Sequence, residues 1–118
     1  MKMVEISRNN ERGIFFEERR FDLIDEMGID VCHLMIMVDA PGEEFEISVT
    51  TSPEYFNKGY ATEGIRRLID WGIKNGYKSV RMTNLFGSEA INHICTKLGF
   101  TKQRSNVWTK TIVGPLGN

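Results

Sequence analysis

The spacing of apolar residues changes abruptly in the middle of the chain, and this change constrains the fold more than any other feature. From Phe45 to Thr50, apolar and polar residues alternate, which is the pattern of a β-strand with one buried face. Beyond Pro53, apolar residues recur every three or four positions up to Gly76, which is the pattern of an amphipathic helix. The sequence therefore predicts a strand, a loop and a helix in direct succession.

The loop between this strand and this helix has the chemistry of an anion-binding site. The first backbone N–H groups of a helix have no partner inside the helix, so they are available to a ligand in front of it. Gly59 lets a ligand approach the backbone without a Cβ in the way, Ala61 keeps the first turn narrow, and Lys58 can add a positive charge. The alternative is that Gly59 is an ordinary turn residue, and the loop alone does not decide between the two.

Shorter patterns predict further strands on both sides of this segment and a second helix. Strands are expected at residues 1–7, 14–24, 31–38, 45–51, 78–83 and 100–113, and the second helix between Ser88 and Gly99. Pro41-Gly42 has the residues of a type II turn, which would join the third and fourth strands as a hairpin. This order predicts an α+β fold as one domain over residues 1–113, followed by a frayed tail at 114–118.

Charge and composition argue against several classes of function. The chain has 15 basic and 16 acidic residues, and this near balance argues against a nucleic-acid binder. No stretch is apolar for long enough to span a bilayer or to act as a signal peptide, so we expect no membrane contact and a cytoplasmic location. Cys32 and Cys95 lack the paired spacing of a zinc site, so we expect two reduced thiols and no structural metal.

Several short stretches follow one another in a recognisable order between Phe45 and Phe100. They are the strand, the entry Pro53-Glu54-Tyr55, the loop and first helical turn Asn57-Lys58-Gly59-Tyr60-Ala61-Thr62-Glu63, the strand at 78–83, and the helix end Lys97-Leu98-Gly99-Phe100. In order and spacing they resemble the core of the GNAT acetyltransferase superfamily. The resemblance implies a twisted mixed β-sheet with two main helices, which opens beside the loop. The two helices that the family usually has near its N-terminus are missing from the predicted elements.

The resemblance implies acetyl-CoA as the cofactor, with its pantetheine arm along residues 49–52 and its pyrophosphate on the backbone of the loop. The cofactor-binding residues would be Val49, Thr50, Thr51, Asn57, Lys58, Gly59, Tyr60, Ala61 and Thr62. The expected reaction is direct transfer of the acetyl group, within a ternary complex, to a primary amine on a protein or small molecule. Strand amides near residues 49–51 would stabilise charge on the carbonyl oxygen.

The same resemblance points to Glu46 and Cys95 as catalytic residues. Glu46 is the first candidate for the general base and His33 the second, whereas Cys95 occupies the position of the tyrosine with which many members protonate the departing thiolate. Each has a plain alternative: Glu46 as a solvated strand residue, His33 as a satisfied core histidine, and Cys95 as a small buried hydrophobe.

The chain also departs from the family pattern in ways that weaken the expected site. Phe56 stands where the family has Gln or Arg, and Ser88 and Ile91 stand where it often has Asn and Ser. These departures favour an alternative function, that of a GNAT-shaped binding or structural protein, of a phage or host-interaction type, that has lost catalysis. The missing helices would leave the acceptor groove open to a large target, or would leave it to be completed by a second copy. The surface patch expected for a partner or a homodimer comprises Tyr60, Arg67 and Trp71.

Overall fold

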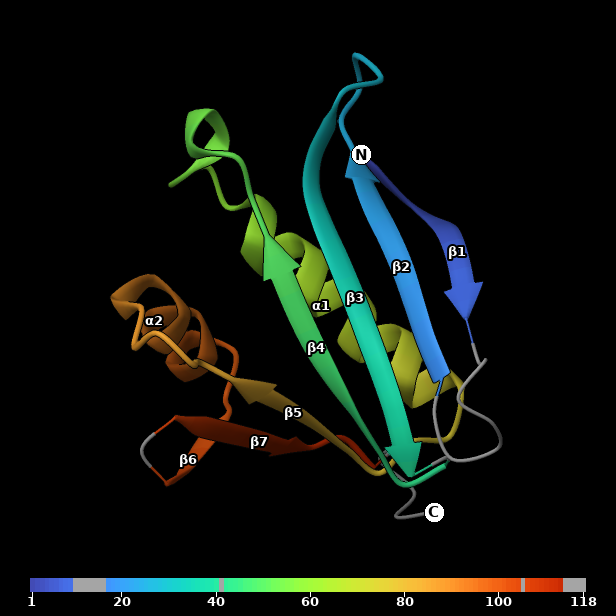
Figure 1. The fold of residues 1–118 in the computed structure, drawn as a ribbon, viewed down its shortest axis with the longest axis vertical. Coiled ribbons are helices and arrows are strands. Elements are labelled where there is room, and N and C mark those ends of the chain that lie inside the picture. Colours follow the sequence, from blue (N-terminus) through green and yellow to red (C-terminus); the bar gives the residue numbers. More distant parts are fainter. Residues whose placement is uncertain (10–16, 41, 105, 114–118) are drawn as a thin grey trace.

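The described residues form one seven-stranded mixed sheet with two helices in a computed structural model, which describes residues 1–9, 17–40, 42–104 and 106–113 (Figure 1). The strands are β1 (Lys2–Asn9), β2 (Glu17–Ile24), β3 (Asp30–Ala40), β4 (Glu44–Thr50), β5 (Ser79–Thr83), β6 (Thr101–Arg104) and β7 (Val107–Thr111). The helices are α1 (Tyr60–Lys74) and α2 (Glu89–Lys97), and a short 3-10 turn, η1, spans Pro53–Tyr55. The sheet order is β1-β2-β3-β4-β5-β7-β6, and β4 and β5 are parallel. The predicted α+β fold with a mixed sheet is confirmed.

One predicted element is wrong, and others fall outside the described residues. The single strand expected at 100–113 is two strands, because the chain turns back and pairs β6 with β7 in an antiparallel hairpin. Residues 14–16, Pro41 of the predicted type II turn, and the tail at 114–118 lie outside the described residues. Gly42, the next residue of that turn, has a φ of 77°.

Both helices pack on the same face of the sheet. The backbone of α1 at Gly72 lies against the ring of Phe45 on β4, and Phe45 is paired with Val80 on β5. Met82, two residues further along β5, shares a face with Val80, and its Sδ lies 4.0 Å from Sγ of Cys95 on α2. The core under the helices is built mainly from Phe21, Leu23, Leu34, Ile36, Phe45, Ile47, Ile65, Leu68, Val80 and Met82.

The other face of the sheet carries no helix in the part of the chain that the structure describes. Only residues 10–16 separate β1 from β2, and this length is too short for the two helices that the family usually has there. Within the same described ranges, no helix is long and apolar enough to cross a membrane. Within the described ranges, the face opposite α1 and α2 is therefore formed by side chains of the strands themselves.

The strands β4 and β5 pair over a short distance and then separate. Their register pairs are Glu44 with Ser79, Phe45 with Val80, and Glu46 with Arg81. Beyond Glu46 the two strands diverge, so the following residues of β4 have no β5 neighbour on that edge (Figure 1). The loop after β4 borders this opening, as the resemblance implied, and the start of α2 borders it as well.

Candidate functional site

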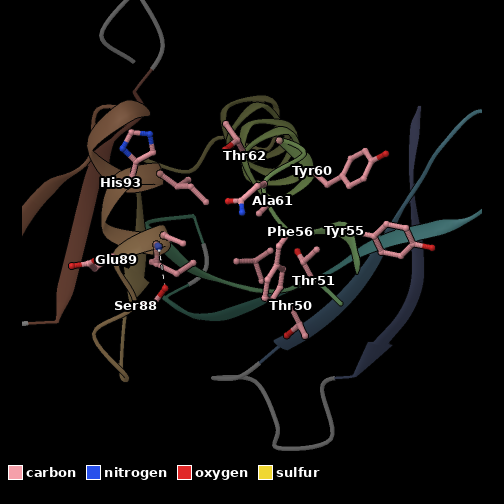
Figure 2. A pocket seen from close by; sticks show the side chains of 16 residues that line it. Thr50, Thr51, Tyr55, Phe56, Tyr60, Ala61, Thr62, Ser88, Glu89 and His93 are labelled. Atoms are coloured by element: carbon pink, nitrogen blue, oxygen red, sulfur yellow. Dashed lines mark hydrogen bonds between the residues drawn. The ribbon is translucent and has the colours of Figure 1, made fainter. Parts of the chain in front are cut away.

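A cavity of about 890 Å³ lies where β4 and β5 separate, between the starts of the two helices. Figure 2 shows Ala61 and Thr62 at the start of α1 on one side, and Ser88, the N-cap residue of α2, with His93 of α2 on the other. Cavities of this size bind small molecules and cofactors. The lining residues are Val49, Thr50, Thr51, Tyr55, Phe56, Asn57, Gly59, Tyr60, Ala61, Thr62, Ser88, Glu89, Ala90, Ile91, His93 and Ile94.

The start of α1 presents backbone donors to this cavity. Gly59 is the N-cap residue with φ 81° and ψ 4°, and no side chain caps the helix. The N–H of Glu63 donates to the Gly59 carbonyl at 3.0 Å, so the N–H groups of the three residues before Glu63 have no partner within the helix. A Cβ at Gly59 would have no protein atom within 4 Å, so this side of the glycine is open. The helix start can therefore hold an anion.

The loop before α1 holds an unusual backbone conformation next to that glycine. Asn57 has φ 61°, a left-handed value that an asparagine adopts more readily than most residues, although it still costs free energy. The aromatic rings of Tyr55 and Tyr60 pack edge to face, with centroids 6.1 Å apart. Phe56, which replaces the polar side chain of the family, is 55% exposed while lining the cavity. An anion at this position would meet backbone amides rather than a polar side chain at residue 56.

The start of α2 is held in place by a network of side-chain amides. Asn84 is buried, and its Oδ1 accepts from the Ser88 N–H at 3.0 Å while its Nδ2 donates to the Ser88 carbonyl at 2.8 Å and to Asn92 Oδ1 at 2.9 Å. Ser88 Oγ caps the helix by accepting from the N–H of Ile91 at 3.3 Å. Trp108 Nε1 of β7 also donates to Asn92 Oδ1, at 3.2 Å. The network fixes one wall of the cavity, where Ile91 and Ile94 add apolar surface.

The predicted cofactor-binding residues converge on this cavity, with one exception. Lys58 is exposed and does not belong to the lining. The residues that line the cavity are Val49, Thr50, Thr51, Asn57, Gly59, Tyr60, Ala61 and Thr62. Their role in holding a cofactor stays a prediction.

The sequence named Phe56, Ser88 and Ile91 only as departures from the family's cofactor site, and it did not name the other lining residues from α2 or Tyr55. Ser88, Glu89, Ala90, Ile91, His93 and Ile94 line the cavity from α2, and Tyr55 and Phe56 line it from the loop. Ser88 was predicted to be the N-cap of α2, but only the sheet topology brings this helix start to the cavity. The signal available in the sequence was a helix that begins soon after the predicted strand at 78–83. Helix starts that follow neighbouring parallel strands lie at the same edge of a sheet.

Glu46 lies outside the cavity lining, at the last register pair before the sheet opens. Its Oε1 accepts two hydrogen bonds from Arg81, from Nε at 3.0 Å and from Nη2 at 2.9 Å. Arg81 Nη1 also donates to Glu44 at 2.7 Å, on the face without helices. The predicted catalytic role of Glu46 stays a prediction, and the structure shows its carboxylate engaged with an arginine.

Cys95 lies in the core and outside the cavity lining. Burial raises the pKa of its thiol to about 11. This placement corresponds to the plain alternative, a small buried hydrophobe beside Met82, and gives no support to a role as proton donor.

His33 is neither buried nor without a partner. Its side chain is 53% exposed, and its Nδ1 lies 2.7 Å from Oδ1 of the buried Asp22. The expectation of a core histidine is therefore wrong, whereas the expectation that its polar atoms are satisfied holds for Nδ1.

Two residues of the predicted surface patch of Tyr60, Arg67 and Trp71 have other neighbours, and the patch stays a prediction. Tyr60 lines the cavity, whereas Trp71 packs against the rings of Phe45 and Tyr77 with centroids 5.4 and 5.5 Å away. Arg19 lies over the Trp71 ring at 5.0 Å. Among the described residues, no cluster of His, Cys, Asp or Glu could hold a metal ion.

Comparison with known proteins gives one family and a set of similar folds. The sequence model of the acetyltransferase (GNAT) family matches residues 17–100. A solved structure of spermidine/spermine N-acetyltransferase mutants from Vibrio cholerae aligns with a TM-score of 0.72 and 15% identity, over 80% of this chain and 67% of that chain. An acetyltransferase (GNAT family) from Bacillus anthracis aligns with a TM-score of 0.73 and 19% identity, over 79% of this chain and 66% of that chain.

A third structure is spermidine N-acetyltransferase from Vibrio cholerae in complex with CoA and spermine. It aligns with a TM-score of 0.72 and 15% identity, over 80% of this chain and 65% of that chain. The chain thus spans about two thirds of the length of these proteins. No curated protein sequence matches the chain.

Proposed function

The chain belongs to the GNAT acetyltransferase family, and we propose that it binds acetyl-CoA in the cavity between α1 and α2 and transfers the acetyl group to a primary amine of a protein or small molecule. The observation that carries the proposal is the uncapped start of α1 at a cavity placed where the sheet opens. One similar structure holds CoA together with spermine, which supports both the cofactor and the amine class of acceptor.

The residues at the start of α1 fit a pyrophosphate. Three N–H groups without a partner inside the helix and the dipole of a 15-residue helix favour negative charge there, and the open side of Gly59 allows close approach. The exposed Lys58 is nearby in the chain and adds a positive charge. The absence of a polar side chain at Phe56 leaves the backbone amides as the main source of binding.

The edge of β4 and the wall of α2 fit the pantetheine arm. Beyond Glu46, β4 has an edge without a strand neighbour, so its N–H and C=O groups are available to the amides of a ligand. The half-buried Ile91 and Ile94 offer apolar contact on the other side.

When bound, acetyl-CoA supplies a thioester whose carbon–sulfur bond breaks as the amine nitrogen bonds to the carbonyl carbon in a ternary complex, and CoA leaves as the thiol. The chain's contribution is to orient the acceptor and cofactor and to place N–H groups of residues 49–51 near the developing negative charge on oxygen. We assign no step to Cys95, because its buried thiol with a pKa of about 11 lies outside the cavity.

The second candidate function is a GNAT-shaped binding protein without catalysis. The observations that favour it are the buried Cys95 at the position of the family's proton donor, and the apolar Phe56 in the loop. This candidate predicts a ligand in the cavity but no acetylated product.

Thermal unfolding and product analysis separate the two functions. We expect acetyl-CoA and CoA to raise the melting temperature. At a ligand concentration of 100 times Kd, binding should stabilise the folded protein by about 2.7 kcal/mol. We expect mass spectrometry to find an acetylated product with spermidine, a peptide with a free N-terminus or a lysine peptide. A thermal shift without any acetylated amine would establish the binding protein, and no shift at millimolar acetyl-CoA would exclude acetyl transfer and support the non-catalytic function.

A further inference from the structure

A histidine–aspartate pair lies beside the opening of the sheet, on the face that α1 and α2 do not cover. Asp22 of β2 and His33 of β3 are directly paired in the sheet register. His33 Nδ1 lies 2.7 Å from Asp22 Oδ1. Asp22 is only 9% exposed, whereas the His33 side chain is 53% exposed. A buried carboxylate thus holds an imidazole that solvent can reach.

The hydrogen bond fixes which ring nitrogen is available. An ionised carboxylate only accepts hydrogen bonds, so Nδ1 carries the proton and donates to Asp22. In the neutral ring, Nε2 then has a free lone pair. One ring carbon separates Nε2 from Nδ1 and their lone pairs diverge, so Nε2 does not point at Asp22. In the described residues no group is bonded to Nε2.

The register places this imidazole one strand away from the cavity, whose lining does not include His33 itself. On the side away from β2, His33 is paired with Thr50 of β4, and Thr50 lines the cavity. Directly paired residues on neighbouring strands have Cβ atoms about 5 Å apart. An amine that enters from the uncovered face would therefore reach His33 and the edge of β4 together.

The charged groups around His33 are few. On β2, Asp22 is its partner, and Arg20 is paired with Met35 and bound to Glu18 at 3.0 Å. The residues of β4 that face it, Ser48 and Thr50, carry no charge. On β3 itself, the next residue on the same face is Met35, an uncharged side chain.

Glu46 is less suited to accept a proton than His33. It lies four residues before Thr50 on β4, about 13 Å along the strand, and its carboxylate already accepts two hydrogen bonds from Arg81. Protonation of Glu46 would weaken both charge-assisted bonds. His33 can take a proton at Nε2 while its bond to Asp22 is kept and strengthened by charge.

We propose that His33 Nε2 accepts the proton of the acceptor ammonium, that Asp22 positions the ring, and that the amine enters from the sheet face opposite α1 and α2. This inference rests on the proposed acetyl transfer. One proton of the ammonium passes to Nε2 and from there to water, and the freed lone pair bonds to the acetyl carbon as the carbon–sulfur bond breaks. The second proton that nitrogen loses goes through solvent to the thiolate, so the products are an amide, CoA thiol and one proton.

His33→Asn is the test variant, because the asparagine amide can still donate to Asp22 from about the position of Nδ1 while Nε2 is removed. With the amine that the wild type acetylates, we expect kcat to fall about 10²-fold or more, in the range of general-base catalysis. We also expect the pH–rate profile to move to higher pH, because without Nε2 only acceptor amine that solvent has already deprotonated can react, while the thermal shift by acetyl-CoA stays unchanged. Asp22→Asn should lower kcat less, and the matched carboxylate-to-amide control Glu18→Gln on the same face should leave kcat and the profile unchanged.

A second measurement does not depend on turnover. In NMR spectra of the protein saturated with CoA, we expect that same amine to shift the ring signals of His33, which His33→Asn identifies by their loss. An unchanged pH–rate profile in His33→Asn, or His33 signals that do not respond to the amine, would overturn the inference and leave the proposed function standing. A wild type that acetylates no amine would remove the proposed function and this inference with it.

Discussion

Replacing Gly59 by alanine separates the strain of the loop from the binding of a ligand, because the chain contains a matched glycine. Gly59 has φ 81° and Gly76 has φ 79°, and an added Cβ would have no neighbour within 4 Å at either position. The two glycines flank opposite ends of α1, whose 15 residues span about 22 Å. The two substitutions should therefore strain the backbone equally, and only one of them is at the cavity.

The strain can be given a magnitude. A left-handed conformation costs a non-glycine residue about 1 to 2 kcal/mol, so both Gly59→Ala and Gly76→Ala should lose about 1 kcal/mol or slightly more. For a domain of this size, 1 kcal/mol corresponds to a fall in melting temperature of about 4 °C. Without ligand, the two variants should melt at nearly the same temperature.

The effect on ligand binding should differ between them. A methyl group at Gly59 would occupy the space through which an anion reaches the first N–H groups of α1. A tenfold loss of affinity is about 1.4 kcal/mol. At a ligand concentration of 100 times the wild-type Kd, the stabilisation would then fall from about 2.7 to about 1.4 kcal/mol. Gly76→Ala should keep the full stabilisation.

Differential scanning calorimetry with and without acetyl-CoA measures both effects. If Gly59→Ala and Gly76→Ala gain equally from acetyl-CoA, the start of α1 does not hold the ligand and the reasoning from its backbone donors is refuted. If the two variants differ strongly without ligand, the assumption of equal strain is refuted instead.

Three further predictions concern packing, thiol chemistry and pH. Gly72→Ala should lower stability by about 1 to 2 kcal/mol, because its Cβ would clash with the buried ring of Phe45 and overpacking outweighs the gain in helix propensity. Chemical denaturation should show a smaller loss for Gly64→Ala, whose Cβ would meet only the flexible end of the Leu34 side chain. With a pKa of about 11, Cys95 should resist iodoacetamide at pH 8 in the folded protein and react in denaturant, as mass spectrometry can show, and alkylation of the native protein at this residue would contradict its burial. Hydrogen bonds from arginine, Arg67 first, lower the pKa of Glu63 below 4.5, so its contribution to stability is present above that pH and is lost as the pH falls. Glu63→Gln should therefore lose less stability than the wild type between pH 6 and pH 3. Equal losses in the two sets of melting curves would count against a lowered pKa of Glu63.

Local patterns in the sequence were sufficient for most secondary structure. The change of period around Pro53 predicted β4 and α1, and the structure places α1 at Tyr60–Lys74, directly after Gly59 and just before Gly76. The α2 N-cap at Ser88 was also readable from the residues alone. These features depend on side chains a few positions apart, which the sequence lists in order.

The final hairpin shows where local patterns fail. The alternation from Phe100 to Val113 is equally compatible with one strand or two, because the period of two continues on both sides of a turn. Pairing of β6 with β7 and of β7 with β5 is what divides this stretch. Strand pairing between distant residues is not visible in any short window of sequence.

The sequence by itself therefore determined the loop with Gly59 and the donors at the start of α1, since both follow from neighbouring residues. The tertiary structure decided which other groups meet that helix start. The sheet order and the three-residue pairing of β4 with β5 bring α2 to the same cavity, and strand register sets His33 between Asp22 and Thr50. Burial decided that Cys95 belongs to the core. Each of these depends on contacts between distant parts of the chain, which only the packed sheet brings together.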